Sequence, residues 1–169
     1  MAIWTRHGFK DIDPWRPLAP GDLDDGVSPV VVGAALWRER AEALTTREGP
    51  VGLRIEPGEE VGDLVALSRR FALIALAFPK FADGRPYSTA RLLRRRGYEG
   101  ELRAVGDVVY DSLPHMMRCG FDSFEVTDPR SLATLRRVNA PAAVALHYQP
   151  GFSGDVAVGG RPWLRRPAG

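Results

Sequence analysis

A group of polar side chains follows the longest apolar run of the sequence. The run, residues 71–78, is apolar throughout, and the segment after it contains Lys80, Asp83, Arg85, Tyr87, Ser88 and Arg91. In parallel α/β folds, ligands bind beyond the carboxyl ends of the strands. Guanidinium and hydroxyl groups beside the backbone N–H groups of a helix start bind phosphates and other oxyanions. We therefore predict a small-anion or phosphate-type site directly after this run.

The predicted anion-binding residues of this segment are Arg85, Tyr87, Ser88 and Arg91. Tyr87, Ser88 and Arg91 lie in a helix expected at residues 86–96, and Arg85 directly precedes it. Helical positions three, four or seven apart share one face. Ser88 and Arg91 have such a spacing, and so do Tyr87 and Arg91. The alternative is structural: Asp83 pairs with Arg85 or Arg91 to fix the turn, and the other arginines are solvated.

The candidates for proton transfer are Lys80, Asp83 and Asp107. A lysine acts as a base or an electrophile when a carboxylate lies near enough to exchange a proton with it. Asp83 follows Lys80 closely, and Asp107 follows a second expected strand at 101–106. Capping of the next helix is the more frequent role for an aspartate placed like Asp107.

Arg103 lies inside that second strand and is the fifth predicted anion-binding residue. Alternation along a strand places Arg103, Val105 and Asp107 on one face. A buried arginine needs a charged partner. We expect a carboxylate, such as Asp107, Asp83 or Glu125, or else a bound anion, and structural pairing is the favoured interpretation.

Strand and helix patterns alternate along the chain. Strands are expected near residues 30–32, 51–55, 71–78, 101–106, 122–126 and 142–146. Helices are expected near residues 34–44, 59–70, 86–96, before Gly120 and from Asp128-Pro129. Strands that recur with helices between them form right-handed βαβ crossovers. The sequence therefore predicts a single α/β domain with a mainly parallel sheet, either open and doubly wound or curled as a partial TIM-like barrel.

The domain is expected to span residues 29–149. Residues 1–28, rich in Asp, Pro and Gly, are predicted to form an irregular or β-like lead-in packed on the domain, and residues 150–169 a disordered tail. Pro114 predicts a helix that starts near Asp111 or is kinked, because a proline beyond the first turn removes an N–H donor.

Composition narrows the functional classes. Cys119 is the only cysteine, so the chain forms no intrachain disulfide and cannot bind an iron–sulfur cluster by itself in the usual way. Its context predicts a buried, inert thiol. A net charge of +2 disfavours a nucleic-acid partner. No secretory signal or membrane span is recognisable, so we expect a cytoplasmic location. No metal or nucleotide motif is present, and the cofactor is left unassigned.

Three blocks of sequence resemble the bacterial DUF934 family. They are residues 78–88 (FPKFADGRPYS), 97–107 (GYEGELRAVGD) and 118–125 (RCGFDSFE). The resemblance covers about residues 30 to 127, with Pro114 and the arginine-rich tail as departures. Members of the family are commonly labelled oxidoreductases involved in sulfite reduction.

The resemblance implies an accessory protein of assimilatory sulfite reduction, with sulfite reductase or another sulfur-assimilation protein as its partner. Because six-electron reduction needs redox cofactors, that partner must supply the electrons. Two alternatives remain open. One is a stand-alone enzyme that acts on a phosphorylated or acidic metabolite through Lys80. The other is a non-catalytic docking or assembly factor for a reductase.

Overall fold

The computed structural model of the chain describes residues 1–59, 62, 66–138, 155–158 and 161–167, with the backbone alone described in the last two ranges. The strand expected at 142–146 and the middle of the helix expected at 59–70 lie outside these residues.

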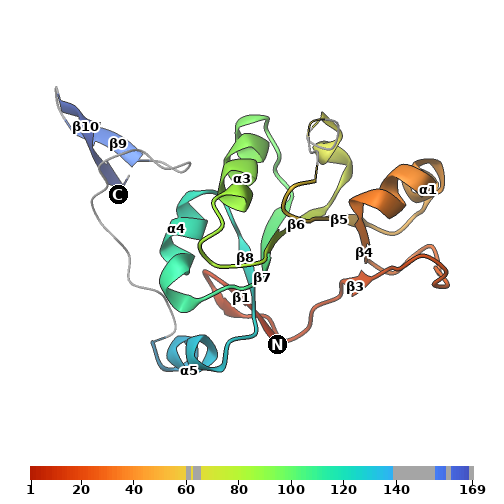
Figure 1. Cartoon of the computed structure of the whole chain (residues 1–169), viewed down its shortest axis with the longest axis horizontal. Coiled ribbons are helices and arrows are strands. Elements are labelled where there is room, and N and C mark those ends of the chain that lie inside the picture. Colours follow the sequence, from red (N-terminus) through yellow and green to blue (C-terminus); the bar gives the residue numbers. More distant parts are fainter. Residues whose placement is uncertain (60–61, 63–65, 139–154, 159–160, 168–169) are drawn as a thin grey trace.

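One eight-stranded sheet organises the described chain (Figure 1), with strand order β2-β1-β8-β7-β6-β5-β4-β3. The strands are β1 (Ala2–Thr5), β2 (Gly8–Phe9), β3 (Arg16–Pro17), β4 (Val30–Gly33), β5 (Val51–Ile55), β6 (Leu73–Phe78), β7 (Glu101–Gly106) and β8 (Ser123–Val126). Neighbours from β3 to β8 pair in parallel, whereas β1 is antiparallel to both β8 and β2. The sheet is curled into a half-barrel. This confirms the expected α/β class and the mainly parallel sheet.

The helices of the described chain contribute to one apolar core. They are α1 (Ala34–Thr46), α3 (Arg85–Arg95), α4 (Leu113–Arg118) and α5 (Pro129–Val138), with short 3₁₀ turns at η1 (Ser68–Arg70) and η2 (Tyr110–Ser112). Each of the four places apolar residues in the same cluster as Ile74, Leu76 and Phe78 of β6. These helices therefore share one face of the sheet, which we call the outer face.

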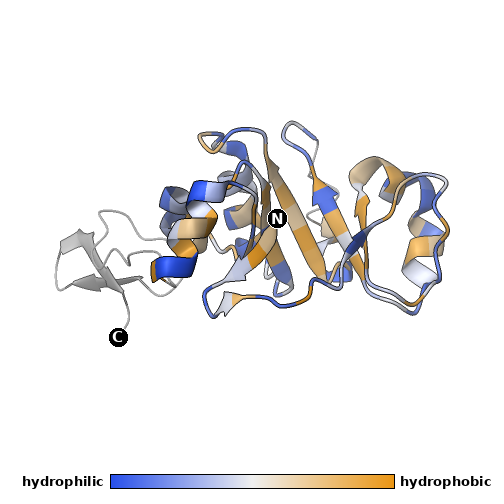
Figure 2. Cartoon of the chain, turned by 90° about the horizontal axis from the view of Figure 1, so that it is seen from below, coloured by the Kyte–Doolittle hydropathy of each residue, from blue (hydrophilic) through white to orange (hydrophobic). Residues whose placement is uncertain are grey.

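The inner face of the sheet has a smaller apolar cluster. Its buried members are Leu73, Ala75, Ala77 and Val105, with Trp15 and Val31 packed against them. All six residues of β6 are buried, as expected for an apolar run covered on both faces. Figure 2 shows apolar colouring along the central strands and a mixture of apolar and hydrophilic colouring on the helices.

The chain between β1 and β3 passes across the inner face. Trp15 packs there over Gly52 of β5, where a Cβ atom would lie 3.2 Å from the indole ring. A side chain at this position would push the indole away, so glycine leaves the space that the ring needs. Residues 1–28, the expected lead-in, thus include strands β1, β2 and β3 of the sheet.

Local chemistry explains where the helices begin. Asp128 accepts a hydrogen bond from the backbone N–H of Ser131 at 2.7 Å, which caps α5 ahead of Pro129. Pro114 stands in the first turn of α4, directly after η2, where its missing N–H costs nothing. The helix thus begins two residues beyond the expected start near Asp111.

In the range expected to be a disordered tail, the described backbone forms an antiparallel pair, β9 (Asp155–Val158) and β10 (Arg161–Pro167). Among the described residues, no helix combines the length and the apolar character needed to cross a bilayer.

Candidate functional site

A cleft of about 570 Å³ opens beyond the carboxyl ends of β5 and β6. Its apolar lining comes from Ile55, Pro57, Leu76, Ala77 and Pro86. Its polar lining comes from Glu56, Glu59, Arg85, Ser88 and Thr89. The loop after β5 forms one wall and the first turn of α3 forms the other. This is the edge at which parallel α/β proteins bind ligands.

Arg85 is the cation of this lining, and Asp83 fixes its orientation. Asp83 accepts from Nε of Arg85 at 3.0 Å (Oδ1) and from Nη2 at 2.6 Å (Oδ2). Its Oδ1 also accepts from the backbone N–H of Arg85 at 3.0 Å. These hydrogen bonds from the side chain and backbone of Arg85 lower the pKa of Asp83 to about 2. Asp83 is therefore ionised at neutral pH.

The contact with Asp83 uses the side edge of the guanidinium, formed by Nε and one Nη2 hydrogen. The end of the group, formed by Nη1 and the second Nη2 hydrogen, makes no hydrogen bond to the residues that the structure describes. A guanidinium end of this kind binds carboxylate, phosphate or sulfate oxygens in a two-point contact. The sequence also suggested an Asp83–Arg85 pair that fixes the turn, and this pair is present. It leaves the N–H donors at the end of the Arg85 guanidinium unused by the described residues.

Gly58 in the opposite wall lies next to this guanidinium. It has φ +94°, and a Cβ atom there would lie 3.4 Å from Nη1 of Arg85. The end of the Arg85 side chain therefore spans the cleft from the start of α3 to the loop after β5. A residue other than glycine would strain the backbone of that loop.

Hydroxyl and carboxylate groups complete the polar lining. Ser88 and Thr89 donate to backbone carbonyls of Gly84 at 3.4 Å and Arg85 at 3.2 Å, so their oxygens retain the capacity to accept. In the other wall, Glu56 forms an ion pair with Arg54 at 2.6 Å. One oxygen of Glu59 accepts from the backbone N–H of Glu56 at 2.7 Å.

The side chains of the three candidates for proton transfer make no described hydrogen bond or ion pair with one another. Lys80 is exposed on the turn after β6, and its carbonyl accepts from the N–H of Asp83. Asp107 accepts from the N–H of Phe81 at 2.9 Å, and its own N–H donates to Phe78. Asp107 thus holds the loop that leads to α3, and no described hydrogen bond joins it to Lys80 or Asp83.

The predicted anion-binding residues of α3 fall into two groups. Arg85 and Ser88 line the cleft, whereas Tyr87 lies against α4 and Arg91 is close enough for its charge to act on His115 of that helix. The Tyr87 ring lies 5.1 Å from that of Phe78 and 4.7 Å from that of His115, between centroids. Burial raises the pKa of Tyr87. Successive helical residues point about 100° apart, and the sequence does not reveal which face meets the cleft.

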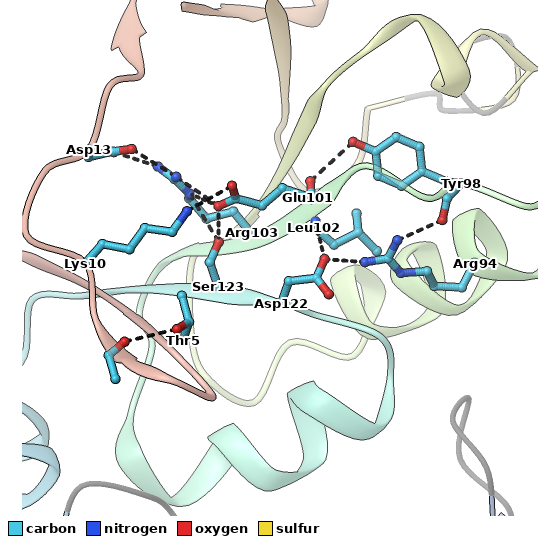
Figure 3. Close-up of polar contacts among 11 residues, drawn as sticks. Thr5, Lys10, Asp13, Arg94, Tyr98, Glu101, Leu102, Arg103, Asp122 and Ser123 are labelled. Atoms are coloured by element: carbon cyan, nitrogen blue, oxygen red, sulfur yellow. Dashed lines mark hydrogen bonds and ion pairs between the residues drawn. The ribbon is translucent and has the colours of Figure 1, made fainter.

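Arg103 lies away from the cleft, in the middle of β7 (Figure 3). It is 3% exposed and makes a two-point contact with Asp13, with Nη1 at 2.6 Å and Nη2 at 3.0 Å from the carboxylate. Nη2 also donates to Glu101 at 2.9 Å, and Nε to Ser123 at 3.3 Å. Lys10 completes the network with an ion pair to Glu101 at 3.0 Å. In this inner-face network, the positive charges of Arg103 and Lys10 balance the negative charges of Asp13 and Glu101.

The kind of partner expected for Arg103 is correct, but the predicted identities are not. Asp83 pairs with Arg85 and Asp107 accepts from the N–H of Phe81. No described hydrogen bond joins Asp83, Asp107 or Glu125 to Arg103. Glu101, two positions earlier, shares the inner face, and Ser123 is directly opposite on β8. Asp13 comes from a segment whose position no short-range pattern predicts.

The electrostatics of Glu101 follow from its surroundings. Burial alone would raise the pKa of Glu101, but hydrogen bonds from Ser123 and Lys10 and the charge of Arg103 outweigh it and lower the pKa. The carboxylate therefore stays ionised in a half-buried position.

A second arginine, Arg94, makes several contacts near the starts of β7 and β8. The sequence pattern did not predict this role. Arg94 donates to backbone carbonyls of Tyr98, Gly100 and Gly120 and pairs with Asp122 (Figure 3). Asp122 also accepts from the N–H of Leu102 at 2.8 Å. These contacts join the end of α3 to the starts of β7 and β8, so the role of Arg94 is structural.

Cys119 is buried, and its Sγ lies 3.9 Å from Nε2 of His115. Burial raises the pKa of the Cys119 thiol, which fits the inert thiol expected from the sequence. Within the described part of the chain, no three His, Cys, Asp or Glu side chains gather as a metal site would require.

Residues 52–159 match the model of a family described as "Bacterial protein of unknown function (DUF934)". The matched range contains the cleft and Arg103, whereas Asp13 lies before it. No curated protein and no solved structure matches the chain.

Proposed function

The chain belongs to the DUF934 family, and on that premise we propose that it is an accessory protein of assimilatory sulfite reduction that binds an oxyanion or phosphate group in the cleft beyond β5 and β6. The pathway comes from the label that family members commonly carry. The anion site comes from the geometry of the cleft.

One observation carries the anion site. Asp83 holds the side edge of the Arg85 guanidinium, so that the end of the group keeps its donors for a ligand. A side chain held in its bound orientation loses less conformational entropy on binding than a free one. Asp83 therefore offsets part of the positive charge of Arg85, and it also holds the guanidinium in one orientation.

The charge balance of the cleft predicts modest affinity for a bare anion. Arg85 is partly neutralised by Asp83, and the lining also carries the carboxylates of Glu56 and Glu59. The Arg85 side chain is 61% exposed, so solvent and salt screen its charge. Such a site senses or positions an anion better than it sequesters one.

The electrons for sulfite reduction must come from another protein. With Cys119 as its only cysteine, the chain cannot hold a cluster by the usual thiolate set. We expect no sulfite reduction by the purified chain alone. Turnover by the isolated chain would contradict the accessory role.

Thermal unfolding with added phosphate, sulfate or sulfite tests the binding component. A ligand that binds only the folded state raises the melting temperature by mass action. Sulfate and phosphate also stabilise proteins non-specifically. The informative quantity is therefore the shift in the wild type minus that in Arg85→Met, with Arg95→Met on the same helix as the control. Equal shifts in all three proteins would refute the site.

A further inference from the structure

We infer that the ligand of the cleft is a phosphorylated sugar, free or as part of a nucleotide, rather than an inorganic oxyanion. The inference rests on the proposed function, since it keeps the phosphate on Arg85 and assigns the rest of the cleft to the remainder of the ligand.

Size is the first argument. The cleft volume of about 570 Å³ lies within the range of about 300–1,000 Å³ that is usual for organic ligands and cofactors. A water molecule takes up about 30 Å³ of liquid, and sulfite, sulfate and phosphate displace only a few water molecules. An inorganic anion bound to Arg85 would leave most of the cleft filled with solvent.

The chemistry of the walls is the second argument. Away from Arg85, the polar side chains of the cleft offer acceptors: the hydroxyl oxygens of Ser88 and Thr89 and the carboxylates of Glu56 and Glu59. Arg54 and the N–H of Glu56 each engage one carboxylate oxygen, so Glu56 and Glu59 each retain another oxygen. A ligand that satisfies them must donate hydrogen bonds. Sugar hydroxyls do so, and carboxylates bind them in many nucleotide sites.

The apolar lining is the third argument. Pro57 in the loop after β5 offers carbon surface between the two polar ends, with small contributions from Ile55, Leu76, Ala77 and Pro86, which are largely buried. A small inorganic ion gains nothing from such a surface. The carbon face of a sugar or a base buries apolar area against it.

Glycines at two helix starts provide a matched pair of blocking variants. Gly84, in the cleft lining, has φ −77°, and a Cβ atom there would meet nothing within 4 Å. Gly33 precedes α1 in the same way, with φ −72° and equally open space, but it lies outside the cleft and its backbone is extended as the last residue of β4. Gly84→Leu should obstruct the cleft without straining the backbone, and Gly33→Leu reproduces the change elsewhere.

The experiment is calorimetric titration of the full chain with inorganic phosphate, methyl phosphate, ribose 5-phosphate and AMP. We expect ribose 5-phosphate or AMP to bind at least about tenfold more tightly than the first two, the effect of a single hydrogen bond to a charged acceptor. Gly84→Leu should abolish this advantage, Glu59→Gln should reduce it, and Gly33→Leu should preserve it. A preference for AMP over ribose 5-phosphate would identify a nucleotide.

The outcomes separate the two claims. Equal affinity for all four compounds, lost in Arg85→Met, would overturn the sugar-phosphate inference and leave the anion site intact. Binding of no compound would overturn both. If the sugar phosphate still binds more tightly than inorganic phosphate in Gly84→Leu, then the sugar binds outside the cleft. That result would also overturn the inference.

Discussion

Asp83 and Arg85, two residues apart, meet through the side edge of the guanidinium, with Nε 3.0 Å from Oδ1 and Nη2 2.6 Å from Oδ2. The same carboxylate accepts from the backbone N–H of Arg85. The pair sits at the start of α3, at the rim of the cleft. Its geometry orients the arginine and leaves the end of the guanidinium for a ligand.

Removal of Asp83 tests this orienting role. In Asp83→Ala, the guanidinium gains rotational freedom, and ordering one such side chain on binding should weaken phosphate affinity by roughly 2- to 10-fold. The titration belongs at high salt, where the altered net charge contributes little. Asp111→Ala, at an exposed aspartate outside the cleft, is the control. Unchanged or tighter binding in Asp83→Ala at high salt would show that Asp83 only competes with the ligand.

The inner-face network predicts a large stability effect at Arg103. Arg103→Met removes the two-point partner of Asp13 and one of the partners of Glu101, which keeps Ser123 and Lys10. Loss of one member of a buried pair costs about 3–5 kcal/mol. Asp13→Ala should cost less, because Glu101 still faces Arg103. Denaturant unfolding measures both, and Arg95→Met should stay within about 0.5 kcal/mol of the wild type. If Arg103→Met lowers the unfolding free energy no more than Arg95→Met does, the network contributes little to stability.

The lowered pKa of Glu101 predicts an acid limit to stability. A carboxylate with a lower pKa in the folded state binds fewer protons there than in the unfolded chain. Its contribution is present above the ordinary pKa of 4.5 and is lost as the pH falls below that value through the folded pKa. Unfolding free energy measured against pH should therefore fall less steeply below pH 4.5 in Glu101→Gln than in the wild type. Parallel curves would contradict the assignment.

Gly58 is predicted to be required for backbone geometry. At φ +94°, alanine is strained, and the left-handed region costs a residue with a side chain about 1–2 kcal/mol. Gly84→Ala is the matched control, since φ there is −77° and the space is open. Chemical denaturation should show a loss for Gly58→Ala and little change for Gly84→Ala. Equal effects would indicate that the loop after β5 relaxes without strain.

The predictable parts of this protein are those encoded over short distances. The apolar run of β6, the alternation of β7 and the Asp128-Pro129 start of α5 are local signals, and the structure confirms them. Local signals did not predict which face of α3 lines the cleft. Tyr87 and Ser88 are adjacent in sequence, and only the packing of α3 on α4 turns Tyr87 away from the cleft and Ser88 toward it.

Long-range partners were beyond local inference for the same reason. Asp13 meets Arg103 across 90 positions of sequence, and Arg94 meets Asp122 across 28. Sequence patterns indicated that Arg103 needs a carboxylate, but not which one. The cleft itself also depends on a long-range relationship, since β5 and β6 bring Gly58 opposite Arg85.

The most direct test of the anion site is calorimetric titration of phosphate into the wild type, Arg85→Met, Arg85→Lys and Arg95→Met. The account predicts that Arg95→Met binds like the wild type and that Arg85→Met does not bind. Arg85→Lys should bind more weakly than the wild type, because an ammonium has the charge without the two-point geometry. Phosphate binding that is equal in the wild type and Arg85→Met would contradict the anion site proposed for this cleft.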